Sequence, residues 1–373
     1  MDGDAQVFYY EEIPVDDDEQ PAPKDELTYV ATACQTRGDM PAKRGGATLT
    51  LVETKGRQYL YMIGGANRDG EMFNDVHRYN LASGEWNHML IENSDSFEPR
   101  SGHTAVAVGS LIYVFGGLNL PQQTTYNSVH VLDTDAMKWS TPPVLNDPPR
   151  PRNAHTALRT SKGIIVFGGS SPSEGAMNDV HLLTIHDAIL TWQAVACHGP
   201  PLHSRELHAA TLLDAKAEAM YVSGGRLADG QLCSESAVLD LGGYFWPASR
   251  HSMAVIDSWT WRVEETGSWR RCGHVVGRIN GALVHYGGWD GGNGFCDDGW
   301  VRQENAEENK LVPLRVERPA SGDCVLLGDE ASAVHDTGRL GHTACVVGPT
   351  LYVFGGMTVV ADLNDLWTLA SRS

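Results

Sequence analysis

Histidine is the residue type in this sequence whose number raises the question of metal binding. Eight of the fifteen histidines recur in two short patterns, five in Arg-x-x-His and three in Val-His. These eight are His103, His155, His208, His274, His342, His77, His130 and His181. A histidine that recurs once per repeat packs its own repeat, and the copies could share one ion only if they lined a common channel. The other seven lack a ligand spacing such as His-x-x-x-His, so we predict no metal site.

Cysteine offers no further metal or redox motif. The seven cysteines are odd in number, scattered, and nowhere arranged as Cys-x-x-Cys. They are Cys34, Cys197, Cys233, Cys272, Cys296, Cys324 and Cys345. The pattern predicts neither a disulfide framework nor a zinc knuckle, and it fits a reducing compartment.

The glycine-rich segments do not match a phosphate-binding loop. Such a loop needs Gly-x4-Gly-Lys-Ser/Thr followed by a helix. The nearest local pattern, Gly291-Gly292-Asn293-Gly294, has no lysine after it. No motif places a nucleophile beside a base. The sequence therefore predicts no catalytic residue and no cofactor.

Glycine doublets instead mark an internal repeat. An apolar run followed by Gly-Gly occurs six times, at 64–65, 116–117, 168–169, 224–225, 287–288 and 355–356. Arg-x-x-His precedes five of the doublets, whereas the first unit keeps Arg44 but has Ala47 in the histidine position. Asn-Asp and then Trp follow the doublet, as at Asn74, Asp75 and Trp86.

The elements that carry these residues are short strands. Apolar runs separated by turn residues, such as Ala105–Val108 and Leu111–Phe115, indicate strands rather than helices. Four strands per unit, repeated six times, predict an all-β, six-bladed propeller with four-stranded blades. Arg-x-x-His-Thr-Ala, the doublet, Asn-Asp and Trp together resemble the kelch repeat over about residues 28–369. The segments GGANRDGEMFNDVH and LYVFGGMT further resemble the small Rab-GTPase effectors built only of kelch repeats.

The last unit lacks a fourth strand of its own. Only six residues follow Trp367, so another segment must complete this blade. Leu27–Cys34 reads as a strand with Tyr29 in the tryptophan position, and its pairing with the last blade would close the ring. We expect one propeller over 27–369, with 370–373 as the C-terminal end.

The first 26 residues carry ten acidic side chains against a single lysine. Such a charge run predicts a flexible acidic tail. The embedded aromatic residues Phe8, Tyr9 and Tyr10 could instead dock into a basic groove of a partner.

Net charge narrows the class of partner. The chain has 28 basic against 47 acidic side chains, a formal net charge of −19, which repels nucleic acid and anionic membrane surfaces. No apolar run approaches the ~18 residues of a membrane span, and the N-terminal residues lack a signal core. We therefore expect no nucleic-acid partner, no membrane insertion, and a cytoplasmic location that includes association with the cytoskeleton or a cilium.

Two units depart from the repeat. The fourth inserts GGYFWPASRHSM before a strand-like run at Ala254–Trp261. The fifth has Asp297-Asp298 in the Asn-Asp position and a predicted strand at Leu311–Val316. Long insertions in a compact domain are commonly functional, so these units are expected to be the individual part of the ring.

The kelch resemblance implies that loops joining the second and third strands form one rim of the ring. These loops are 66–73, 118–126, 170–177, 226–233, 289–296 and 357–363. Their candidate contact residues, of types that dominate protein interfaces, are Arg68, Phe73, Gln122, Tyr126, Arg226, Trp289, Asp290 and Phe295. The resulting prediction is a non-catalytic interaction platform, an adaptor or scaffold in a larger assembly, whose protein partner has a basic surface.

Two other functions were compatible with parts of the pattern. A carbohydrate-active kelch propeller with a small-molecule pocket at the channel mouth is the alternative, because the pockets of such enzymes have loose signatures. A substrate receptor of a ubiquitin ligase is disfavoured, because neither the stretch before residue 28 nor that after 369 has room for a ligase-recruiting domain.

Overall fold

The computed structural model describes residues 28–214, 216, 218–242, 259–265, 269–302, 311–317 and 338–372. Its described strands form six antiparallel four-stranded groups, called here blades 1 to 6 in chain order. Blades 1 to 3 comprise β3 (Thr48–Thr54), β4 (Arg57–Ala66), β5 (Met72–Asn80) and β6 (Glu85–His88); β7 (Thr104–Val108), β8 (Leu111–Phe115), β11 (Val129–Asp133) and β12 (Lys138–Ser140); and β14 (Thr156–Thr160), β15 (Gly163–Phe167), β18 (Val180–His186) and β19 (Ile189–Val195).

The second half of the ring repeats this order. Blades 4 to 6 comprise β21 (Ala209–Leu212), β22 (Ala219–Ser223), β24 (Glu235–Asp240) and β25 (Thr260–Glu265); β26 (Val275–Ile279), β27 (Ala282–Tyr286), β28 (Gly299–Arg302) and β29 (Leu311–Glu317); and β30 (Thr343–Val347), β31 (Thr350–Met357), β32 (Asp362–Ser371) and β1 (Thr28–Ala33). Shorter elements lie in the connections: β2 (Arg37–Gly38), the 3-10 turn η1 (Ser94–Ser96), β9 (Leu118–Asn119), β10 (Thr124–Thr125), β13 (Val144–Leu145), β16 (Ser170–Ser171), β17 (Gly175–Ala176), β20 (Arg205–Glu206) and β23 (Arg226–Leu227).

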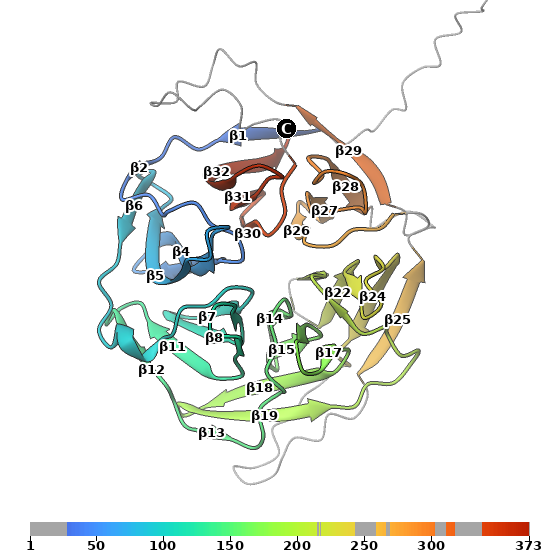
Figure 1. The fold of residues 1–373 in the computed structure, drawn as a ribbon, viewed down its shortest axis with the longest axis horizontal. Coiled ribbons are helices and arrows are strands. Elements are labelled where there is room, and N and C mark those ends of the chain that lie inside the picture. Colours follow the sequence, from blue (N-terminus) through green and yellow to red (C-terminus); the bar gives the residue numbers. More distant parts are fainter. Residues whose placement is uncertain are drawn as a thin grey trace, which may run out of the picture.

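The blades surround a common axis (Figure 1). Their first strands contact one another in sequence around the ring, and β30 of blade 6 contacts β3 of blade 1. The β-propeller class predicted from the repeat is confirmed by this arrangement.

An N-terminal strand completes the last blade, as predicted. β1 pairs antiparallel with β32, with Ala33 opposite Trp367, and its first residues pair in parallel with β29 (Figure 1). Tyr29 is fully buried in the core shared by blades 5 and 6. It does not take the predicted tryptophan position, because Ala31 pairs with Leu369 as Trp139 pairs with Leu132. The unpaired edge of blade 6 is thereby covered by a segment more than 300 residues distant in the chain.

The core lies between the blades, where each fourth-strand tryptophan meets an aromatic ring. Trp192 packs on Phe115 of the preceding blade with 4.9 Å between ring centroids, and Trp86 packs on Phe354 at 5.5 Å. Trp139 stacks on Phe97 at 4.3 Å. Trp86, Trp139 and Trp192 are all fully buried.

The irregular blades agree only in part with the prediction. β29 covers the predicted strand Leu311–Val316 and adds one residue. In blade 4 the described part of the fourth strand is Thr260–Glu265, which shares Thr260 and Trp261 with the predicted run. Most of the predicted run, and the insertion before it, lie outside the described residues.

Candidate functional site

The arginine of Arg-x-x-His is buried and forms hydrogen bonds within its own blade. In blade 3, Arg152 Nη1 donates to the carbonyl oxygen of Gly168 at 2.9 Å, and its two terminal nitrogens contact both carboxylate oxygens of Asp179 at 2.7 and 2.8 Å. The arginine thus contacts both the doublet glycine, 16 residues later in the chain, and the aspartate of the Asn-Asp motif. The same bidentate pair occurs between Arg271 and Asp298 in blade 5. In blades 3 and 5 these charges thus neutralise one another within the framework of the blade.

Burial by itself would raise the pKa of the Asp75 and Asp179 carboxyls. Hydrogen bonds from a histidine and an arginine, together with the arginine charge, hold both pKa values well below the usual range. Both side chains are therefore carboxylates throughout the physiological pH range.

The histidine of Arg-x-x-His joins neighbouring blades. His155 of blade 3 is hydrogen-bonded through Nε2 to Thr104 Oγ1 of blade 2 at 2.9 Å, and His208 of blade 4 to Thr156 of blade 3 at 2.9 Å. Each ring lies against the first glycine of a doublet: a Cβ on Gly116 would stand 2.7 Å from His155 Cε1. The doublet therefore makes room for the imidazole of the next blade.

These imidazoles are held neutral. Burial, and then the positive charge of the adjacent arginine, lowers the pKa of His103, His208 and His342 to about 3. The pKa values of His155 and His274 are also lowered well below 6.5 for the same reasons, with neighbouring histidines adding to the effect.

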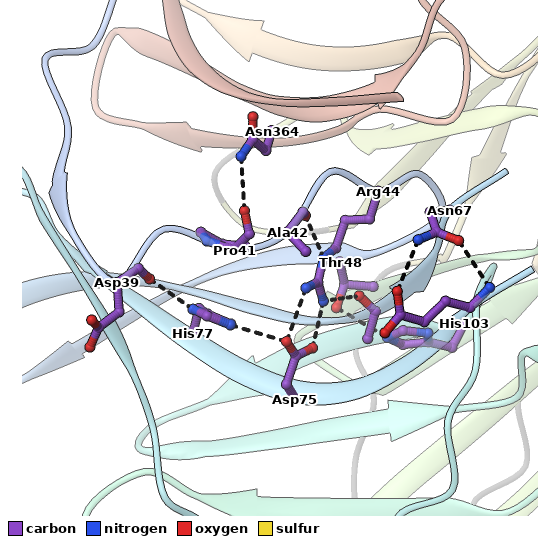
Figure 2. A network of polar contacts seen from close by, with 12 residues as sticks. Asp39, Pro41, Ala42, Arg44, Thr48, Asn67, Asp75, His77, His103 and Asn364 are labelled. Carbon is purple, nitrogen blue, oxygen red and sulfur yellow. Dashed lines mark hydrogen bonds and ion pairs between the residues drawn. The ribbon is translucent and has the colours of Figure 1, made fainter. Parts of the chain in front are cut away.

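The junction of blades 6 and 1 closes without this imidazole, because Ala47 occupies its position. Asn364 Nδ2 donates to the carbonyl oxygen of Pro41 at 3.0 Å, a contact that the repeat also makes from Asn127 to Pro149 (Figure 2). The backbone nitrogen of Arg68 donates to Asp362 Oδ2 at 2.8 Å, and Arg68 Nη2 donates to the Thr358 carbonyl at 3.0 Å. Arg68, predicted as a partner contact, thus also links the rim loops of blades 1 and 6.

Two of the predicted aromatic contacts cover the buried arginines. The Arg44 guanidinium lies 3.8 Å from the ring centroid of Phe73, and that of Arg100 lies 4.0 Å from the ring centroid of Tyr126. Both rings are only partly exposed and pack on their own blades. The geometry gives each of them a framework role beside the predicted binding role.

The other predicted rim residues lie nearer to solvent. Arg226 is exposed and forms an ion pair with Glu206, whose other oxygen accepts from Ser170 of blade 3. Trp289 is half-buried, and its Nε1 donates to the carbonyl oxygen of Gly292 at 2.8 Å. Gln122 and Asp290 are exposed, and Phe295 is half-buried.

Three exposed apolar side chains on the rim were missed from the sequence. Leu120 in the loop of blade 2 is 68% exposed, and Val359 and Val360 in the loop of blade 6 are 62% and 80% exposed. These two blades flank blade 1. The available signal was an aliphatic residue within a loop between two predicted strands.

Several expectations lie outside the described residues. They include the acidic tail with Phe8, Tyr9 and Tyr10, and the insertion of blade 4. Within the part of the chain that the structure describes, no helix is long and apolar enough to cross a membrane.

Comparison with known protein families agrees with the β-propeller fold. The KLHDC2/KLHL20/DRC7 Kelch-repeats domain matches residues 25–214 and 154–325, most of the chain. The chain belongs to the kelch-repeat family. The predicted resemblance is thereby confirmed.

Individual kelch proteins match at modest identity. The chain is 30% identical to the Rab9 effector protein with kelch motifs of Bos taurus over 214 residues, 56% of this chain and 54% of that protein. It is 26% identical to Kelch domain-containing protein 3 of Rattus norvegicus over 318 residues, 80% of this chain and 74% of that protein. It is 29% identical to Host cell factor of Drosophila melanogaster over 290 residues, 68% of this chain and 18% of that protein. The chain thus spans about half the length of the Rab9 effector that it matches.

Proposed function

We propose that this kelch ring is a non-catalytic platform that binds a protein partner through the rim formed by the loops between second and third strands. The observation that carries the proposal is the set of exposed aliphatic tips, Leu120, Val359 and Val360, on this face. Exposed apolar side chains on a polar rim are typical of interaction surfaces.

The hydrogen bonds of the polar groups conserved within the repeat support the rim as the binding surface. The buried arginines, their carboxylate partners and the bridging histidines are occupied within and between blades. A partner must therefore be recognised by residues outside the repeat pattern, and the rim loops supply them.

Charge on the rim supports a basic partner. The six loops contain two arginines against six carboxylates. Both arginines are already paired, Arg68 with Asp362 and Arg226 with Glu206. The uncompensated acidic side chains would steer a basic surface toward the aliphatic tips and set its orientation.

The narrower role is an adaptor or scaffold subunit of a cytoplasmic assembly. One relative is named a Rab9 effector, which supports a role in which the ring recognises another protein. Arg226, Trp289, Asp290, Gln122 and Phe295 would extend the contact around the rim, and no nucleic acid or membrane insertion is involved.

Affinity capture with rim variants tests the proposal. The immobilised full chain is compared with Leu120→Asp and Val360→Asp by quantitative mass spectrometry of captured proteins. Each change should reduce capture of a specific partner about fivefold or more, because a central apolar contact is worth more than about 1 kcal/mol. Capture should also weaken as salt rises.

The matched control is Ile189→Asp. Ile189 is also an exposed aliphatic residue, but it is the first residue of β19, at the end of the β18–β19 hairpin away from the rim. This variant should capture as wild type, and all three should melt alike. Capture that ignores the rim changes, or turnover of a sugar by the purified ring, would overturn the proposal.

A further inference from the structure

Three potential metal ligands converge on one face of the hairpin β5–β6 in blade 1. Asp75 and His77 stand two residues apart on β5, so their side chains share a face of the strand. His88 on β6 lies directly opposite His77 in the antiparallel register, and their ring centroids are 4.9 Å apart. One ligand atom from each of the three side chains lies within 4.8 Å of the others.

Hydrogen bonding fixes how His77 faces this cluster (Figure 2). His77 Nδ1 is 3.0 Å from the backbone carbonyl oxygen of Asp39, which can only accept, so Nδ1 carries the proton. Nε2 lies 3.1 Å from Asp75 Oδ2. In the neutral imidazole two lone pairs would then face each other. A cation between or beside these two atoms removes the conflict, and a backbone carbonyl on the second nitrogen is the usual support of a metal-bound histidine.

The ion pair with Arg44 leaves room for this cation. Arg44 Nη1 donates a hydrogen bond to Asp75 Oδ1, and Nη2 donates to Oδ2 at 3.0 Å. A carboxylate oxygen has two acceptor positions, so Oδ2 keeps one that faces His77. Arg44 would orient the carboxylate as a second ligand shell does.

The other blades provide an internal comparison. In blade 3 the Asp179–His181 pair has the same geometry, with Nε2 at 2.8 Å from Oδ2. There Nδ1 of His181 has no hydrogen-bond partner among the described residues, so Nε2 is free to carry the proton and donate. The residue opposite His181 is Ala194, not histidine. Of these two blades, blade 1 has both a carbonyl oxygen at histidine Nδ1 and a third potential ligand, His88.

We propose that Asp75, His77 and His88 bind a zinc ion, with solvent completing a tetrahedral site. One carboxylate and two imidazoles suit this ion. His88 is exposed, so the ion has access from solvent. The bound ion would join β5 to β6 and, through the Asp39 carbonyl, to the segment that leads from the closing strand into blade 1.

Calorimetric titration of the full chain with zinc tests this site. We expect one equivalent to bind, and His88→Ala to weaken that binding about tenfold or more, because it removes a ligand. His186→Ala is the control, since His186 is an exposed histidine elsewhere in the ring. The wild-type melting temperature should rise with zinc, whereas that of His88→Ala should not.

Cobalt(II) in place of zinc identifies the ligands. A tetrahedral spectrum without thiolate charge transfer is expected, and it should disappear in His88→Ala. Absence of one-equivalent binding in the wild type, equal binding in His88→Ala, or a thiolate signal would each overturn the proposal.

Discussion

Mild acid should unfold this ring through the histidines that bridge its blades. The five histidines of Arg-x-x-His are buried, with pKa values far below the ordinary 6.5. Because each folded pKa lies below the unfolded value, the unfolded chain binds more protons. The contribution of the neutral imidazoles to the free energy of unfolding is therefore fully present above pH 6.5 and is lost as the pH falls below this value.

The expected loss is large. At pH 5.5, one unit below the unfolded value, each such histidine destabilises the fold by between about 1 and 2 kcal/mol, and five by roughly 7 kcal/mol. The total is comparable to the whole stability of a typical domain, ~5–15 kcal/mol. His130 and His285, whose pKa values are lowered to about 4 and about 3 chiefly by burial, add in the same direction.

The carboxylates act in a separate range. The pKa values of Asp75 and Asp179 are below the ordinary 3.8, so their contribution is present above that value and declines only at lower pH. Loss of stability between pH 6.5 and 5.5 is thus assigned to histidine.

Thermal unfolding followed by calorimetry from pH 7.5 to 5 measures this effect. The pH dependence of the melting temperature, combined with the enthalpy, gives the number of protons taken up on unfolding. We expect about six near pH 5.5, because each of the seven histidines takes up about 0.9 of a proton on unfolding, and about one fewer in His342→Gln at the same pH. Uptake of one proton or none would refute the reasoning, because it would mean that the imidazoles titrate normally in the folded ring.

Further predictions concern closure, packing and binding. Deletion of 1–34 removes β1 and should cause aggregation or loss of a cooperative melt, whereas deletion of 1–22 keeps β1 and should melt as the full chain; equal melting would exclude closure by β1. Trp139→Ala should cost on the order of 3–5 kcal/mol in denaturant unfolding, and a cost below about 1 kcal/mol would contradict its core position. Charge reversal at Arg226 or alanine at Trp289 should weaken partner capture while thermal stability stays within about 1 kcal/mol; a matching loss of stability would assign both side chains to the framework.

The sequence was most informative where one interaction recurs in every blade. The fixed spacing from Arg152 to Gly168 and on to Asp179 reflects one buried cluster, so repetition alone revealed its structural role. The closing strand was placed for the same reason, since the missing strand of blade 6 had to come from elsewhere. Its register was predicted two residues off, because Ala31 rather than Tyr29 lies opposite Leu369.

Features formed by pairing or exposure could not be predicted in this way. His88 lies eleven residues after His77, a spacing without meaning until the hairpin register sets the two opposite each other. Leu120 and Val360 are unremarkable aliphatic residues in sequence, and only their position at loop tips distinguishes them from core residues. Phe73 shows the converse, because an aromatic loop residue packs on a buried arginine.

At the junction of blades 4 and 5, residues on both sides of the contact between the blades differ from the repeat pattern. Ser223 stands where blade 2 has Phe115, and the fourth strand of blade 5 has no tryptophan to meet an aromatic ring. Ser223 Oγ instead lies 3.1 Å from His274 Nε2 and 3.4 Å from His285 Nδ1. Trp269, from the connection into blade 5, packs on both imidazoles at 5.1 and 5.2 Å. The changes on the two blades are complementary, because Trp269 and the two imidazoles fill the space that the phenylalanine and the fourth-strand tryptophan fill elsewhere. Each substitution in such a ring must therefore be compared with the facing residue of the neighbouring blade, since it is that contact which the repeat preserves.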